Sequence, residues 1–142
     1  MKGLFIKADD EIVVKIFLAN GKDGRLYSDI DKLKLVEVAD GQVEESQVEE
    51  HEVIFKKPSF GDRTKILSKA TSILGDGANG VNINIDIAVA RFKAMSSLIK
   101  RWSFKDDQGN PLPVTEANIY QMDPIVATMI AVQFDNGTGG II

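Results

Sequence analysis

The chain of 142 residues has no cysteine and only one histidine, His51. The lack of cysteine excludes disulfides, thiolate nucleophiles and thiolate metal ligands, and one histidine cannot form any of the common zinc sites. His51 could serve as a general base, but we find no neighbouring nucleophile for it to activate, so we interpret it as a surface side chain. We therefore predict no catalytic residue, no metal and no cofactor, and expect a protein that is not an enzyme.

Long apolar runs are also missing. No stretch approaches the roughly 18 apolar residues of a membrane-spanning helix, and the opening sequence MKGLFIKADD does not have the apolar segment of a signal peptide. We expect no membrane association. Hydrophobic residues make up 44% of the chain and charged residues 27%, values typical of a globular protein that can bury a core. The length fits one soluble folded unit.

The charges are unevenly distributed. Residues 1–52 carry a net charge of −6, residues 53–105 carry +7, and residues 106–142 carry −5 with no basic side chain. Such blocks either offset one another within one fold or orient the molecule toward a partner. The basic block would suit nucleic-acid phosphates. However, the isoelectric point is near 5.0, which argues against nucleic acid as the partner.

The N-terminal part has the composition of β-strands. Residues 12–18 are rich in β-branched and aromatic side chains, and two turn-forming pairs, Asn20-Gly21 and Asp23-Gly24, follow them. Further strands are expected at 33–38 and 53–55, which would complete an antiparallel β-hairpin or small meander. Five glutamates fall in residues 44–52, and we expect a solvated loop or a charged strand edge there.

After Pro58 the apolar period becomes helical. Ser59 can cap a helix that extends to Leu74 and ends at Gly75. A longer helix is expected from about residue 84 to residue 102, although 81–85 alternates as a strand would, so its start stays open.

Two more helix starts follow in the sequence. Thr115 opens a short helix through Tyr120, and Asp123-Pro124 opens a last helix that runs to Phe134. That last helix is apolar on nearly every side, which predicts burial in the core or docking on a partner.

The sequence therefore predicts an α+β fold. Residues 1–58 form a β-rich N-terminal part, residues 59–134 a C-terminal helical region of three to four helices, and residues 135–142 a flexible tail, all within one folded unit. Gly75, Gly77 and Gly80 match the dinucleotide-binding pattern G-x-G-x-x-G letter for letter. We reject that function because a helix, rather than a strand, is expected before the first glycine.

The C-terminal half resembles a known family. The extended segment FKKPSFGDR at 55–63 is followed by a helix and by LIKRWSF at 98–104. The turn DQGNPLP at 107–113 comes next, and DPIVA at 123–127 opens the last helix. Over about residues 53–134 this order resembles the tail assembly chaperones of tailed bacteriophages and neighbouring virion-assembly proteins.

The resemblance implies a non-enzymatic role in tail morphogenesis. Such chaperones bind the tape-measure protein and help tail-tube subunits to polymerise around it, in the host cytoplasm. A structural virion component of the neck, tail or capsid is the alternative, and a nucleic-acid-binding accessory protein is a weaker one. Whether the chain forms a homo-oligomer stays an open question at this point. The candidate side chains for contact with a protein partner are Trp102, Phe104, Tyr120, Met122, Ile125, Met129 and Phe134, and ordinary core packing is the alternative for each of them.

Overall fold

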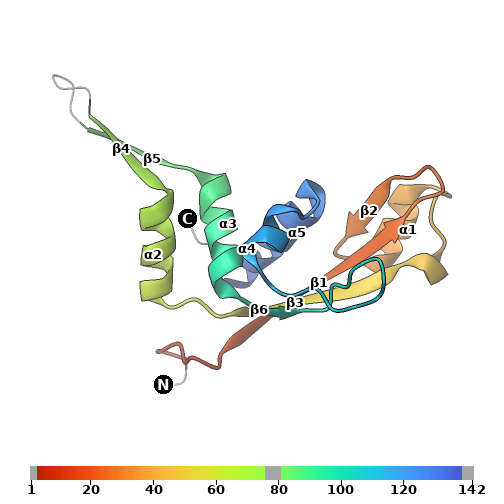
Figure 1. Cartoon of the computed structure of the whole chain (residues 1–142), viewed down its shortest axis with the longest axis horizontal. Helices are drawn as coiled ribbons and strands as arrows, with labels where there is room; N and C mark the ends of the chain where they lie inside the picture. Colours follow the sequence, from red (N-terminus) through yellow and green to blue (C-terminus); the bar gives the residue numbers. More distant parts are fainter. Residues whose placement is uncertain (1–2, 76–80, 139–142) are drawn as a thin grey trace.

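The computed structural model describes residues 3–75 and 81–138, and its centre is a four-stranded antiparallel sheet in the order β2-β1-β3-β6 (Figure 1). Helices follow and cover the sheet, so the predicted α+β class is confirmed. The last strand of the sheet comes from the C-terminal half of the chain, so the two halves share one sheet. The strands are β1 (Glu11–Asn20), β2 (Leu26–Asp29), β3 (Glu49–Lys56) and β6 (Ile99–Trp102).

The β1–β2 hairpin turns where the sequence predicts, with Gly24 at a φ of +80°. The second strand is β2, which we did not predict, and the strand expected at 33–38 is wrong: helix α1 (Lys32–Ala39) occupies it. The Asp31 side chain caps α1 by accepting hydrogen bonds from the backbone N–H groups of Leu33 and Lys34. This cap and the packing of its buried face outweigh the strand preference of its β-branched residues.

The acidic run divides between a short 3-10 turn, η1 (Glu45–Gln47), and the first half of β3. β6 pairs with Val53, Ile54 and Phe55, and Glu52 is bonded to Ser103 just after β6, so residues 49–51 form their ladder with β1 alone. The alternative of a charged strand edge therefore describes residues 49–52 better than a loop does. On the outer face of the sheet, Glu50 and Glu52 each lie 3.6 Å from the Lys15 ammonium.

Four helices follow in the C-terminal half: α2 (Phe60–Ala70), α3 (Ile87–Leu98), α4 (Glu116–Tyr120) and α5 (Pro124–Thr138). The predicted caps are confirmed. Ser59 and Asp62 form a reciprocal capping box at α2. Thr115 accepts from the N–H of Asn118 at α4, and at the start of α5 the carboxylate of Asp123 accepts from the N–H of the second helical residue.

Three helix limits differ from the prediction. α2 ends at Ala70, and residues 71–75, expected to be helical, form strand β4 (Thr71–Gly75) of a projecting hairpin with β5 (Val81–Ile85) (Figure 1). α3 ends at Leu98, because the next four residues enter the sheet as β6. α5 continues to Thr138, so residues 135–138 are helical rather than part of a tail. Gly75, the first glycine of the G-x-G-x-x-G pattern, therefore ends a strand and not a helix. This strand belongs to an antiparallel hairpin rather than to the strand–helix unit that binds dinucleotides, and Gly77 and Gly80 lie outside the described residues.

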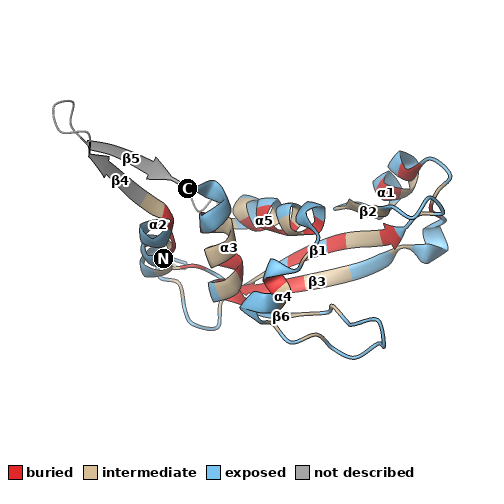
Figure 2. Cartoon of the chain, turned by 45° about the horizontal axis from the view of Figure 1, so that its top comes forward, coloured by how far each residue is buried: buried red, intermediate tan, exposed pale blue. Residues whose placement is uncertain are grey.

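The main core lies between one face of the sheet and helices α3 and α5 (Figure 2). Phe55 of β3 and Phe134 of α5 stack at its centre, with ring centroids 4.3 Å apart. A smaller cluster on the other side contains Leu35 and Ala39 of α1 against Ala19 of β1. None of the helices seen among the described residues combines the length and apolarity that a bilayer crossing requires.

Candidate protein interface around helix α5

Helix α5 has two apolar faces, of which only one is used by the core. Val126, Ile130 and Phe134 follow each other at intervals of four residues, and all are at least 95% buried. Ile125 and Val132 belong to the other face and are 61% and 40% exposed. Because the helix is apolar on both faces, the side chains of Ile125 and Val132 are left partly uncovered within the described chain.

The exposed face borders a groove of about 600 Å³, which we call the outer groove. Its apolar side chains on α5 are Ile125, Met129 and Val132, spaced at i, i+4 and i+7. Ile30, which follows β2 and is 51% exposed, forms the opposite apolar wall. At 1.5 Å per residue the α5 stripe from 125 to 132 is about 10 Å long, which matches two turns of a partner helix.

A second groove, of about 280 Å³, lies on the other side of the start of α5, and we call it the inner groove. Trp102 and Phe104 form its wall, with their rings 5.3 Å apart and at 65°. The Trp102 indole N–H donates to the carbonyl of Leu112 at 2.7 Å, so the ring is held in place. Met122, just before α5, also borders this groove and supplies an adaptable side chain.

The seven side chains predicted to contact a partner fall into three groups. Five of them border the two grooves: Ile125 and Met129 the outer one, and Trp102, Phe104 and Met122 the inner one. Tyr120 is 77% exposed on α4, outside both grooves, where its ring meets the edge of Phe92. Phe134 is only 2% exposed and stacks in the core, so its prediction as a surface contact is wrong.

Among the described residues, the outer groove is bordered by an acidic residue and by no basic one. Asp29 borders the outer groove and Asp123 the inner one, where Lys105 is the basic neighbour. Residues 106–142 contain five acidic side chains and no basic one. A partner segment with lysine or arginine beside its apolar residues would therefore complement this surface.

The structure also brings together residues that the sequence does not connect. The Ser103 hydroxyl lies 3.3 Å from His51 Nδ1, and His51 Nε2 lies 3.0 Å from the Glu49 carboxylate. His51 also packs on Phe104, with ring centroids 5.0 Å apart, and its side chain is only 15% exposed. Our interpretation of His51 as a surface side chain is therefore wrong, because the chain after β6 covers it.

This row of hydrogen bonds has the residue types of a nucleophilic triad, but its geometry is that of a strand connection. The Ser103 oxygen accepts a hydrogen bond from the backbone N–H of Glu52 at 2.9 Å, while the N–H of Ser103 donates to the carbonyl of Glu52. Ser103 thus continues the β3–β6 pairing by one residue, and the oxygen that would attack a substrate is engaged with the backbone. No local sequence signal could have revealed the contact, because the two residues are 52 positions apart.

Among residues 3–75 and 81–138, no three or more histidine, aspartate or glutamate side chains are grouped in a way that could hold a metal ion. Comparison of the chain with protein-family models, with curated proteins and with solved structures finds no match.

Proposed function

We propose that the chain is a non-enzymatic binding protein that receives an apolar helical segment of another protein along α5. The observation that carries this proposal is the second apolar face of α5, with Ile125, Met129 and Val132 in one stripe beside an open groove. A helix with anchors at i, i+3 or i+4, and i+7 is the natural occupant of such a groove.

The free energy that burial of the exposed α5 side chains can supply favours a partner that uses both grooves. Full burial of one aliphatic side chain is worth about 1.5–3 kcal/mol, so covering the partly exposed stripe supplies roughly 2–4 kcal/mol. Association costs about 4 kcal/mol or more in lost translational and rotational freedom. The outer groove alone therefore gives weak binding, and Trp102 and Phe104 in the inner groove are the next surface that the same partner can reach.

The resemblance to phage tail assembly chaperones names the partner that we propose: the tape-measure protein, or a tail-tube protein during assembly. A long helical protein with exposed apolar stripes has the chemistry that the two grooves accept. The acidic surroundings of α5 add the expectation that the bound segment is basic beside its apolar residues.

The test is co-expression of the full chain with a tape-measure protein, followed by co-purification. The double variant Ile125→Ser and Val132→Ser should reduce the amount of recovered complex by about tenfold or more, which corresponds to a loss of about 1.4 kcal/mol. The matched control is Leu33→Ser with Val38→Ser, since these α1 residues are 69% and 64% exposed at the far end of the sheet (Figure 1).

Two outcomes would contradict the proposal. If the α5 variant and the α1 control bind the partner equally well, α5 is not the interface. If purified virions contain the chain at a fixed copy number, the structural virion component is the better reading and the chaperone role is lost.

A further inference from the structure

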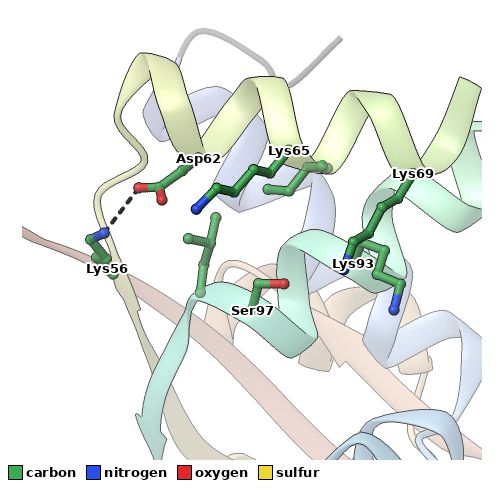
Figure 3. Close-up of a pocket in the computed structure, with 8 residues that line it drawn as sticks. Lys56, Asp62, Lys65, Lys69, Lys93 and Ser97 are labelled. Atoms are coloured by element: carbon green, nitrogen blue, oxygen red, sulfur yellow. Dashed lines mark hydrogen bonds and ion pairs between the residues drawn. The ribbon is translucent and has the colours of Figure 1, made fainter.

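A basic cleft lies between helices α2 and α3, away from both α5 grooves (Figure 3). Lys65 and Lys69 reach it from α2, Lys93 from α3 and Lys56 from the end of β3. Its volume is about 150 Å³, and its apolar floor is made by Ile66 and Leu98, side chains that are at least 97% buried. Four lysine side chains from three elements thus line one small cleft.

Within the described part of the chain, one of these four charges has an acidic partner. Asp62 lies 3.0 Å from the Lys56 ammonium, and its carboxylate also accepts the N–H of Ser59 at 3.0 Å. The Ser59 hydrogen bond and the Lys56 ammonium hold the pKa of Asp62 below its ordinary value, so it stays ionised and committed to these two donors. Within the described residues, Lys65, Lys69 and Lys93 form no ion pair. The cleft therefore keeps a net charge of about +3, since its four lysines face one carboxylate.

We propose that this cleft binds a phosphate group. Like charges in a concave site concentrate the positive potential, and a compact dianion relieves their mutual repulsion. Lysine binds phosphate as a point charge, so the cleft does not need the planar fork of arginine to hold it. The Ser97 hydroxyl at the same cleft is a further donor for a phosphate oxygen.

The size of the cleft limits what it can hold. A water molecule has a share of about 30 Å³ in the liquid, so 150 Å³ accommodates about five waters, or one phosphate with part of its hydration. Whole small molecules occupy pockets of roughly 300–1,000 Å³. The site is thus a single-phosphate site, and the phosphate can be free or part of a larger molecule whose remainder lies outside the cleft.

The test uses the full chain, titrated with inorganic phosphate and pyrophosphate at constant ionic strength and followed by backbone amide NMR. Phosphate should shift the amides of α2 and α3 around Lys65, Lys69, Lys93 and Ser97 in a saturable way, while chloride at equal ionic strength should not. A single-stranded DNA oligonucleotide without terminal phosphates separates the two sources. Competition by the oligonucleotide identifies a backbone phosphate as the ligand, and its failure to compete identifies a free or terminal phosphate.

The variant for this test is Lys65→Gln, Lys69→Gln and Lys93→Gln, and the matched control is Lys22→Gln, Lys32→Gln and Lys34→Gln. Both remove three positive charges, but the control residues lie on the β1–β2 turn and on α1. The cleft variant should weaken phosphate binding by about tenfold or more, and the control by less than about twofold, since distant charges are screened. Absence of saturable shifts in the unmodified chain, or an equal loss in both variants, would overturn the proposal.

Discussion

Substitutions on the buried face of α5 should lower the free energy of unfolding far more than substitutions on its exposed face, and Phe134 provides the sharper test. Its ring is 2% exposed and stacks on Phe55 at 4.3 Å and 29°. Phe134→Ala removes this contact and leaves a cavity, which costs about 3–5 kcal/mol in comparable cores. Because a domain is stable by about 5–15 kcal/mol in total, this single change should remove about a fifth or more of the free energy of unfolding.

The exposed face should tolerate polar substitution. Val132→Ser on the same helix removes a side chain that is 40% exposed and borders the outer groove. Serine and valine have similar helix propensities, so the change should cost only the burial of the covered part of the valine, about 1 kcal/mol of the free energy of unfolding. The contrast between Phe134 and Val132 thus isolates burial from helix propensity.

The assay is equilibrium unfolding in urea, followed by the fluorescence of Trp102, the one tryptophan, and by far-ultraviolet circular dichroism. A pure change in stability shifts the midpoint and leaves the slope unchanged. If Phe134→Ala does not fold, Phe134→Leu keeps most of the volume and should cost about 1 kcal/mol. A loss below about 1 kcal/mol for Phe134→Ala, or an equal loss for Val132→Ser, would refute the assignment of the two faces.

Three further predictions concern single local contacts. Asp62→Asn should lower the free energy of unfolding at pH 7 by about 1 kcal/mol. The Ser59 N–H holds the pKa of Asp62 in the folded protein below its ordinary value. This stabilisation is therefore fully present above the unfolded-state pKa of Asp62 and disappears as the pH falls through the folded-state pKa. Acid titration of both proteins by circular dichroism should show that the difference in their free energies of unfolding vanishes at low pH. The Tyr27 hydroxyl donates a hydrogen bond to Asp23 at 2.6 Å, which raises the pKa of Tyr27. Asp23→Asn should therefore lower the pKa of Tyr27. An unchanged titration of the Tyr27 ring by NMR would contradict the contact. Gly24→Ala should cost about 1–2 kcal/mol in thermal unfolding because its φ of +80° is strained for a side chain, and a neutral result would argue against this turn.

Local signals in the sequence were sufficient wherever a few consecutive residues decide the structure. The starts of α2, α4 and α5 were predicted from Ser59, Thr115 and Asp123, because a cap needs only a side-chain oxygen two or three residues before a free N–H. The β1–β2 turn was predicted for the same reason, from two Asx-Gly pairs.

Long-range pairing explains the errors. Residues 99–102 continue the helical spacing of α3, but they form β6 because Ile99 and Trp102 pair with Phe55 and Val53, more than forty positions away. β2 is a strand of four residues with no apolar alternation, and it exists through its pairing with β1. A short apolar run fits both the helical and the strand repeat of apolar residues, so neither β6 nor β2 could be assigned without knowing its partner strand.

For the proposed interface, too, the sequence predicted that α5 is apolar but not which of its side chains face outward. The apolar character of α5 was sufficient to predict that it packs or docks, and five of the seven chosen residues border its grooves. The sequence could not separate Ile125 and Met129 from Phe134, because 125, 129 and 134 all occur in one uninterrupted apolar helix and any rotation of it about its axis would bury an apolar stripe. Phe55 on β3 stacks on Phe134 and so fixes which face of the helix is buried. Ile125 is then 61% exposed, whereas Met129 is only partly buried. The surface available to a partner is therefore set by a contact inside the core.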